Sequence, residues 1–290
     1  MRLSLNGTEI FFDVDGAKLA IDAGGSVRER PTVVVLPGGP GFDHVYLRAG
    51  LSPLAADAQL VFVDPRGCGR SGRPPLETWT LDQVAADVVG LCERLGIERP
   101  FVFGHSAGGF VALTMAWKHP DLVRGLLLCD TVPALRPHTD AHPPPASLEQ
   151  RAPAEVAAIK DRFFGGDMSD ESMALFASEV VPYYAGPAHM EAARAVGASG
   201  GMEVSVAKHF FGTQARAYDM HPVLGDIRVP TLVMVGAHDW VCSPAASRAI
   251  AAKIPGAELV VFETAGHFGF AEVPAEFQGA VRAFLARVAV

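Results

Sequence analysis

Short, uninterrupted apolar runs recur toward both ends of the chain, and each stops near Gly, Asp or another polar residue. The runs cover residues 32–36, 60–63, 101–103, 126–129, 232–235 and 259–262. A strand in a parallel sheet is buried on both faces, so it is apolar at every position rather than at alternate ones. The runs therefore predict buried parallel strands. Residues 3–21 alternate less cleanly and predict an antiparallel hairpin.

Amphipathic segments lie between several of these runs. Residues 81–95 and 109–118 have helical periodicity, with Gly96 after the first and Pro120 after the second, and residues 274–288 form a third such segment. Strands that alternate with helices in this way fold into a mostly parallel sheet with helices on both faces. The predicted fold class is α/β.

The pattern changes between residues 133 and 222. Strand signals vanish, and three consecutive prolines at 143–145 indicate an exposed linker. Helical stretches follow at 154–164, 169–184 and 188–211. We interpret residues 133–222 as a helical cap inserted between core strands, and residues 1–132 together with 223–290 as the core.

Residues 104–108 read Gly-His-Ser-Ala-Gly and match the pattern G-x-S-x-G. The pattern follows a predicted strand and precedes a predicted helix, which is the context of a nucleophilic serine on a sharp turn. The glycines leave room for close packing at the turn, and the helix N-terminus favours negative charge that develops beside Ser106. Ser106 is therefore the predicted nucleophile.

A nucleophilic serine needs a base, and the base needs an acid that orients it. In this strand–turn–helix context the chain order is Ser, then Asp or Glu, then His. Asp239 follows the strand at 232–235, and His267 is the one histidine that follows the last strand, so they are the predicted acid and base. Asp130 also comes directly after a strand and is a rival for the acid.

A glycine-rich loop, Pro-Gly-Gly-Pro-Gly at residues 37–41, follows the strand at 32–36. A loop in this place brings a backbone N–H close to the nucleophile, where it would form an oxyanion hole with the N–H of Ala107. No Gly-Lys-Ser/Thr follows the loop, so it does not match a phosphate-binding loop.

Together these motifs resemble the α/β-hydrolase fold. The loop at 37–41, followed by Asp-Pro-Arg-Gly-Cys-Gly-Arg-Ser at 64–71, is similar to the proline iminopeptidase branch of that fold. The resemblance covers about residues 10–132 and 223–290. It implies a helical cap over the active site, serine acyl-enzyme chemistry and no cofactor, and it favours Gly39 as the oxyanion donor of the loop.

The chain departs from the iminopeptidases at three places. Pro37 replaces their usual His, and the elbow reads Gly-His-Ser-Ala-Gly rather than Gly-Gly-Ser-Trp-Gly. Ala207 stands where those enzymes carry a cap Glu that helps hold the free amino group of the substrate. Burying an ammonium without a carboxylate is costly. Ala207 therefore argues against aminopeptidase activity, unless Glu203, one helical turn earlier, replaces the missing carboxylate.

Aromatic side chains are frequent in the cap, and some are expected to line an apolar pocket. The predicted substrate-binding residues are Phe42, His105, Phe210, Phe211, Trp240 and Phe268. His138 and His142 have i, i+4 spacing, but they lie in a proline-rich stretch without a third ligand in view. No metal site is predicted there.

Composition narrows the functional class. Hydrophobic residues make up 49% and charged residues 19%, which excludes an intrinsically disordered chain. A net charge of −8 without a basic run argues against nucleic acid as a partner. Four dispersed cysteines indicate a reducing compartment. No signal-peptide pattern and no membrane-spanning apolar run are found, so the expectation is a cytoplasmic protein that acts on a small molecule.

The predicted function is that of a serine hydrolase that cleaves a small-molecule ester, lactone or amide. Proline iminopeptidase activity is the first alternative. A related C–C hydrolase or a haloalkane dehalogenase is another, although dehalogenases usually carry Asp where this chain has Ser106. A non-catalytic ligand-binding or receptor module on the same fold would keep the pocket without the chemistry.

Overall fold

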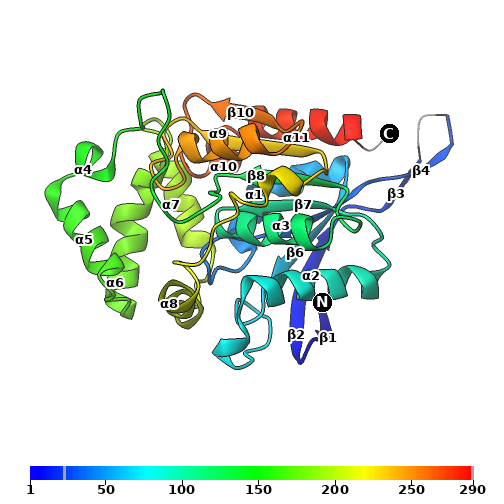
Figure 1. Cartoon of the computed structure of the whole chain (residues 1–290), viewed down its shortest axis with the longest axis horizontal. Helices are drawn as coiled ribbons and strands as arrows, with labels where there is room; N and C mark the ends of the chain where they lie inside the picture. The colour runs from blue at the N-terminus through cyan, green and yellow to red at the C-terminus, as the bar shows by residue number, and fades with distance from the viewer. Residues whose placement is uncertain (22–23, 289–290) are drawn as a thin grey trace.

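An eight-stranded sheet forms the centre of the computed structural model, which describes residues 1–21 and 24–288 (Figure 1). In spatial order its strands are β1 (Arg2–Leu5), β2 (Thr8–Asp15), β6 (Gln59–Asp64), β5 (Thr32–Leu36), β7 (Phe101–His105), β8 (Gly125–Cys129), β9 (Thr231–Gly236) and β10 (Glu258–Phe262). From β6 to β10 in this order, neighbouring strands are parallel, whereas β2 pairs antiparallel with both β1 and β6. The predicted mostly parallel sheet is confirmed.

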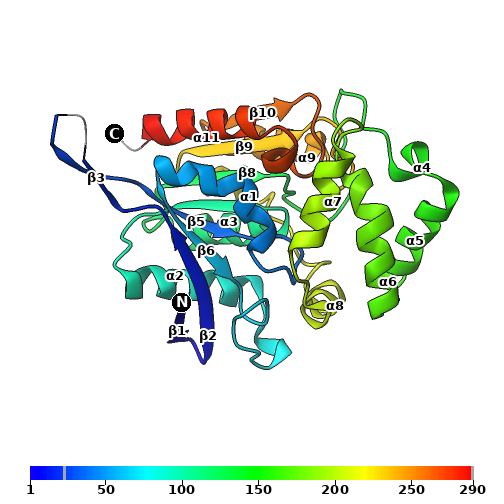
Figure 2. The same cartoon turned by 180° about the vertical axis from the view of Figure 1, so that it is seen from behind.

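Alternate side chains of each buried strand enter two separate cores. Val33 and Val35 of β5 pack on one face of the sheet, and Val34 and Leu36 pack on the other. The face with Val34 and Leu36 is covered by α2 (Leu81–Leu95), α3 (Ala107–Lys118) and α9 (Pro244–Lys253) (Figure 1). The face with Val33 and Val35 is covered by α1 (Val45–Leu51), α10 (Gly269–Glu272) and α11 (Pro274–Val288) (Figure 2). None of the described helices is both long and apolar enough to cross a membrane.

The N-terminal region contains two antiparallel pairs rather than one hairpin. β1 pairs with β2 and extends the main sheet, whereas β3 (Leu19–Ile21) pairs with β4 (Val27–Glu29) in a separate two-stranded sheet. This second pair projects from the body of the molecule (Figures 1 and 2). The prediction for residues 3–21 is therefore correct only for the part that joins the main sheet.

Residues 133–222, which we call the insertion, lie between β8 and β9. The insertion contains α4 (Leu148–Arg151), α5 (Ala154–Phe164), α6 (Asp170–Leu175), a π-helical turn (Phe176–Val180), a 3-10 turn (Val181–Tyr184), α7 (Met190–Ser199) and α8 (Val204–Thr213). Shorter 3-10 turns elsewhere cover Ser52–Ala56, Leu76–Thr78 and Leu224–Asp226. The stretch predicted at 188–211 is two helices, because Gly200 is extended and ends α7. Figure 2 shows the insertion at one end of the sheet, opposite β3.

A buried ion pair holds the loop after β6 against α2. The Arg66 side chain is 2% exposed and donates through Nε to Asp87 Oδ2 at 2.6 Å and through Nη2 to Asp87 Oδ1 at 2.7 Å. Its remaining donors reach the carbonyl of Asn6 at 3.2 Å and the hydroxyl of Thr78 at 3.0 Å. Because every branch of the guanidinium has a protein acceptor, Arg66 stabilises this loop rather than binding a ligand.

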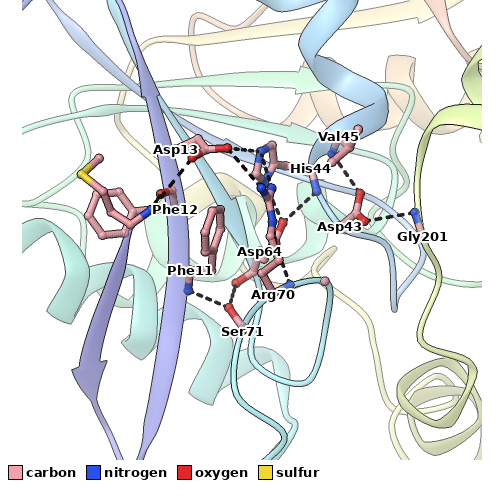
Figure 3. A network of polar contacts seen from close by, with 12 residues as sticks. Phe11, Phe12, Asp13, Asp43, His44, Val45, Asp64, Arg70, Ser71 and Gly201 are labelled. Carbon is pink, nitrogen blue, oxygen red and sulfur yellow. Dashed lines mark hydrogen bonds and ion pairs between the residues drawn. The ribbon is translucent and has the colours of Figure 1, made fainter.

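A second polar network begins at the carboxyl end of β6 (Figure 3). Asp64 accepts hydrogen bonds from His44 Nδ1 at 2.6 Å and from the backbone N–H of His44 and Arg70 at 3.1 and 2.9 Å. The Ser71 hydroxyl donates to the Asp64 carbonyl at 2.6 Å and accepts from the N–H of Phe11 at 2.8 Å. The network therefore joins β2, β6 and the start of α1, and it fixes the end of the loop that follows β5.

We predict that Asp87→Ala lowers the free energy of unfolding by about 3–5 kcal/mol, because it leaves the buried Arg66 guanidinium unpaired. The double variant Arg66→Met/Asp87→Leu removes both charges and is expected to recover most of that loss. Urea unfolding followed by circular dichroism measures both values. Equal losses in the single and double variants would contradict this account of the pair.

Candidate active site

Ser106 lies on the turn between β7 and α3. Its backbone has φ +51° and ψ −121°, which is unfavourable for a residue with a Cβ atom. Three hydrogen bonds hold this conformation. The Ser106 N–H donates to the Cys129 carbonyl at 3.0 Å, and the Ser106 carbonyl accepts from the Thr131 hydroxyl at 2.7 Å and from the Gly109 N–H at 2.9 Å. The strained turn presents the half-buried Ser106 side chain to a cavity.

The glycines of the G-x-S-x-G pattern allow α3 to pack closely on the sheet. A Cβ atom at Gly104 would clash with the carbonyl of Gly108, and one at Gly108 would clash with the carbonyl of Leu36. These contacts are with backbone atoms, so a neighbouring side chain cannot move aside to make room. The spacing of the motif thus follows from contacts among β5, β7 and the first turn of α3.

Asp239 and His267 lie together although 28 positions separate them in the chain. His267 Nδ1 donates to Asp239 Oδ2 at 2.8 Å, and Asp239 Oδ1 accepts from the N–H groups of Val241 and Cys242, each at 2.8 Å. The His267 N–H donates to the carbonyl of Tyr184 in the insertion at 2.8 Å. Because an ionised carboxylate only accepts hydrogen bonds, Asp239 places the imidazole proton on Nδ1 and leaves Nε2 as a base.

The charge of Asp239 sets the basicity of His267. Burial alone would lower the pKa of His267, but the charge and hydrogen bond of Asp239 raise it above its usual value of 6.5. The rival acid, Asp130, accepts from the Gly236 N–H at 3.0 Å and from the Cys129 thiol at 3.1 Å. Burial and the charge of Asp239 raise the pKa of Asp130 to about 7. Direct contact with the imidazole favours Asp239 as the orienting acid.

The glycine-rich loop lies beside the elbow, and its N–H groups have different partners. The Gly38 N–H donates to the Tyr46 hydroxyl at 2.7 Å. Within the described residues, no hydrogen bond occupies the N–H of Gly39 or that of Ala107. Gly39 has φ +114°, a conformation that glycine tolerates. The two N–H groups predicted for the oxyanion hole are thus free to bind an oxygen.

The insertion is hydrogen-bonded directly to this loop. The Asp43 N–H donates to the Gly201 carbonyl at 3.0 Å, and Asp43 Oδ2 accepts from the Gly201 N–H at 3.1 Å (Figure 3). Phe42 and Met202 form an antiparallel β-bridge. The Gly41 carbonyl accepts a hydrogen bond from the N–H of Glu203 at 2.8 Å. The position of the loop therefore depends on the insertion as well as on the sheet.

A cavity of about 720 Å³ separates the strand ends from the insertion. Segments that follow β5, β7, β8, β9 and β10 reach it, with lining residues that include Gly39, Ser106, Val132, Trp240 and His267. The insertion contributes mainly apolar side chains: Phe163, Phe164, Met173, Phe176, Val181, Val196, Met202 and Phe211. None of the described lining residues is Asp or Glu. The cavity therefore suits a largely apolar molecule without a buried positive charge.

Five of the six predicted pocket residues, Phe42, His105, Phe211, Trp240 and Phe268, line this cavity, and the prediction for Phe210 is wrong. Phe210 is fully buried away from the cavity, where its ring packs against Trp79 and Phe110, because it faces the core side of α8.

His105 borders the cavity but is only 2% exposed. Both of its ring nitrogens bond to protein: Nδ1 to the Tyr46 hydroxyl at 2.8 Å and Nε2 to the His267 carbonyl at 2.9 Å. With both nitrogens occupied, His105 cannot also form a polar contact with a substrate.

Glu203 does not replace the carboxylate that Ala207 lacks. Its side chain caps α8, where Oε1 accepts from the Ser205 hydroxyl at 2.6 Å. Its Oε2 forms an ion pair with Arg73 Nε at 3.4 Å. Glu203 is not among the residues that line the cavity, and Ala207 is buried in the core. The predicted loss of a cap carboxylate therefore has no compensation at this position.

Cys242 is a site residue that the sequence analysis missed. It lines the cavity together with Ser106, and burial together with the charges of Asp239 and Asp130 raises the thiol pKa well above 9. The only signal in the sequence is its place three residues after Asp239. In the described part of the chain, Asp239, Cys242 and His267 are the one cluster with three possible metal-ligand atoms, all within 4.8 Å of one another. Asp239 and His267 already bond to each other, and all three residues lie at the site of Ser106, so the cluster belongs to the serine site.

Comparisons with known proteins identify relatives of this chain. A family described as alpha/beta hydrolase fold matches residues 31–274. Proline iminopeptidase PfmaB of Pestalotiopsis fici is 30% identical over 264 residues, which cover 89% of this chain and 92% of that protein. A putative carbamate hydrolase, RutD of a Caulobacter species, is 28% identical over 265 residues, which cover 90% of this chain and 93% of that protein. A thermophilic esterase from Thermogutta terrifontis superposes with a TM-score of 0.72, 26% identity and full coverage of both chains.

We predict that kcat/KM for ester hydrolysis falls as the pH drops, with a midpoint above 6.5, because protonated His267 cannot accept the Ser106 proton. Asp239→Asn removes the charge that raises this pKa, so the midpoint moves to lower pH. It also places an amide beside Nδ1 and favours the wrong tautomer, which lowers kcat by about 10⁴-fold. Initial rates between pH 5 and 9 test both effects.

Asp130→Asn is the matched control for Asp239→Asn. It removes a buried carboxylate from the same region but leaves the hydrogen bond between Asp239 and His267 in place. We expect a smaller loss in kcat than for Asp239→Asn. If Asp130→Asn gave the larger loss, Asp130 rather than Asp239 would be the acid.

Proposed function

This chain belongs to the α/β-hydrolase fold family and is a hydrolase, and from that premise we propose that it is a serine hydrolase that cleaves a small ester, lactone or neutral amide. The hydrogen bond between Asp239 and His267, at the wall of the cavity that also contains Ser106, is the observation that carries this proposal. Their order in the chain and their positions at the strand ends fit a nucleophile, a base and an orienting acid.

In the acylation step, His267 Nε2 accepts the proton of the Ser106 hydroxyl while the serine oxygen attacks the substrate carbonyl carbon. The N–H groups of Gly39 and Ala107 donate to the negative oxygen that forms, and the N-terminus of α3 favours the same charge. Asp239 stabilises the protonated imidazole without accepting its proton. The carbon–oxygen or carbon–nitrogen bond then breaks as His267 gives its proton to the leaving group.

Deacylation repeats these steps with water. His267 takes a proton from a water molecule, whose oxygen attacks the acyl carbon bound to Ser106. The tetrahedral intermediate collapses when His267 returns the proton to the serine oxygen. A carboxylic acid leaves and the free Ser106 hydroxyl is restored, so the cycle needs only groups of this chain and water.

The walls of the cavity support a neutral substrate with an apolar acyl or leaving group. The insertion serves in this proposal as a cap that supplies most of the apolar wall, including Phe176 and Phe211. Proline iminopeptidase is the second candidate, because relatives of this chain carry that name. A substrate with a free amine would bring an ammonium into a cavity whose described lining has no carboxylate, which is unfavourable.

We predict that Ser106→Ala lowers kcat for an activated ester such as p-nitrophenyl butyrate by about 10⁶-fold, because the acyl-enzyme cannot form. The wild-type protein is expected to release a burst of p-nitrophenol equal to the number of active sites, and the variant none. Circular dichroism and the unfolding temperature confirm that both proteins are folded. A folded Ser106→Ala protein with wild-type turnover contradicts the mechanism, and the binding-module alternative predicts no turnover from either protein.

Substrate class is tested with a short-chain p-nitrophenyl ester, a γ-lactone, a proline anilide and the N-acetylated form of that anilide. We expect the ester and the lactone to be cleaved and the free-amine anilide to be a poor substrate, since no cavity carboxylate is available to pair with its ammonium. Rapid cleavage of the free-amine anilide, together with slow cleavage of its acetylated form, would establish the iminopeptidase instead.

A further inference from the structure

A chain of buried hydrogen bonds runs behind the site and connects the glycine-rich loop to the loop of His267. It joins the Gly38 N–H to the Tyr46 hydroxyl at 2.7 Å, that hydroxyl to His105 Nδ1 at 2.8 Å, and His105 Nε2 to the His267 carbonyl at 2.9 Å. Tyr46 is 6% exposed and His105 is 2% exposed. These hydrogen bonds thus link the segment after β5, the last residue of β7 and the segment after β10, which are remote in sequence.

The protons in this series of hydrogen bonds can be arranged in only one way. The His267 carbonyl can only accept, so His105 carries its proton on Nε2, and Nδ1 must accept from the Tyr46 hydroxyl. The Tyr46 hydroxyl donates its single proton to His105, so toward the Gly38 N–H its oxygen can only accept. Burial lowers the pKa of His105 and raises that of Tyr46, so both groups stay neutral and this arrangement persists.

We propose that Tyr46 and His105 are positioning residues of the hydrolase, which hold the oxyanion loop in register with the catalytic histidine. Tyr46 fixes the Gly38 peptide by accepting its N–H and leaves the next N–H, that of Gly39, to bind the oxyanion. His105 holds the backbone of His267 at a fixed distance from the same hydroxyl. This inference rests on the proposed serine-hydrolase function and assigns roles outside its triad.

Strong coupling is expected because each link is buried. The Gly38 N–H loses its hydrogen-bond partner if the Tyr46 hydroxyl is removed, and an unpaired buried donor favours movement of the loop. Movement of an oxyanion donor by about 1 Å is enough to lower the rate of the chemical step by about 100-fold. The effect falls on transition-state stabilisation, so KM is expected to change little.

The first test is Tyr46→Phe, with Tyr218→Phe as the matched control. Tyr218 is also buried and donates to a backbone carbonyl, that of Val132, at 3.0 Å, but it does not line the cavity. We expect Tyr46→Phe to lower kcat for an activated ester by about 100-fold, while Tyr218→Phe keeps kcat near the wild-type value. Circular dichroism and the unfolding temperature verify the fold of each variant.

A thionoester distinguishes oxyanion positioning from a general loss of stability. Its sulfur accepts hydrogen bonds weakly, so an intact oxyanion hole cleaves the ester faster than the matching thionoester. We expect this rate ratio to fall toward one in Tyr46→Phe and to remain at the wild-type value in Tyr218→Phe. A folded Tyr46→Phe protein with an unchanged ratio, or an equal fall in the control, overturns the inference.

Two substitutions of His105 separate the links of the chain. In His105→Asn, the amide oxygen lies near the position of Nδ1 and keeps only the hydrogen bond from the Tyr46 hydroxyl. In His105→Gln, the amide NH₂ lies near the position of Nε2 and keeps only the hydrogen bond to the His267 carbonyl. We expect His105→Gln to lose the ester–thionoester discrimination and His105→Asn to retain it. This comparison also decides the question if Tyr46→Phe fails to fold, and equal ratios in the two His105 variants overturn the inference.

The outcomes also separate this inference from the proposed function. Turnover that depends on Ser106, with discrimination that is insensitive to Tyr46 and His105, refutes the positioning roles and leaves the serine hydrolase intact. Absence of any turnover that depends on Ser106 refutes both. In the double variant Tyr46→Phe/His105→Gln, little further loss in kcat is expected, because each single change already breaks the link between the two residues.

Discussion

The conformation of the Ser106 backbone is the constraint on which the site depends. A residue with a Cβ atom is held at φ +51°, and close packing of Gly108 against Gly104 and Leu36 allows the chain no relaxed alternative. The same contacts place the N-terminus of α3 under the serine hydroxyl. Strain, glycine spacing and the electrostatic benefit of the helix N-terminus are therefore consequences of one packing arrangement.

Parallel strands bring the remaining groups to the same edge of the sheet, but loops alone would not hold them there. Hydrogen bonds between loops provide the missing rigidity: Asp43 joins the glycine-rich loop to Gly201 of the insertion, and His105 joins Tyr46 to the carbonyl of His267. The bonds of His105 are buried, the bond between Asp43 and Gly201 is exposed, and all of them join segments far apart in sequence. Pre-organised donors of this kind are the main source of transition-state stabilisation in acyl transfer.

The charges of the site are arranged on one side of the imidazole. Asp239 bonds His267 directly, and Asp130 lies close enough for the charge of Asp239 to raise its pKa. The described wall of the cavity is largely apolar, although Arg136 and His138 also line it, and it has no carboxylate. This separation keeps His267 basic while the substrate side stays suited to a neutral molecule, which is the physical ground for preferring an ester or lactone to a free amine.

Local patterns in the sequence were sufficient for the parallel sheet, the elbow at Ser106 and the positions of Asp239 and His267 after their strands, because apolar runs and glycine spacing report burial and close approach directly. The tertiary structure decided what depends on the direction of a side chain. Phe210 and Phe211 are adjacent, yet only Phe211 lines the cavity. Contacts of Asp239 rather than Asp130 with His267, and of Tyr46 with His105, likewise join separate segments. Sequence periodicity indicates which face of a helix or strand is buried. The orientation of the helix and the packing of the loops determine which side chains from distant parts of the sequence contact that face.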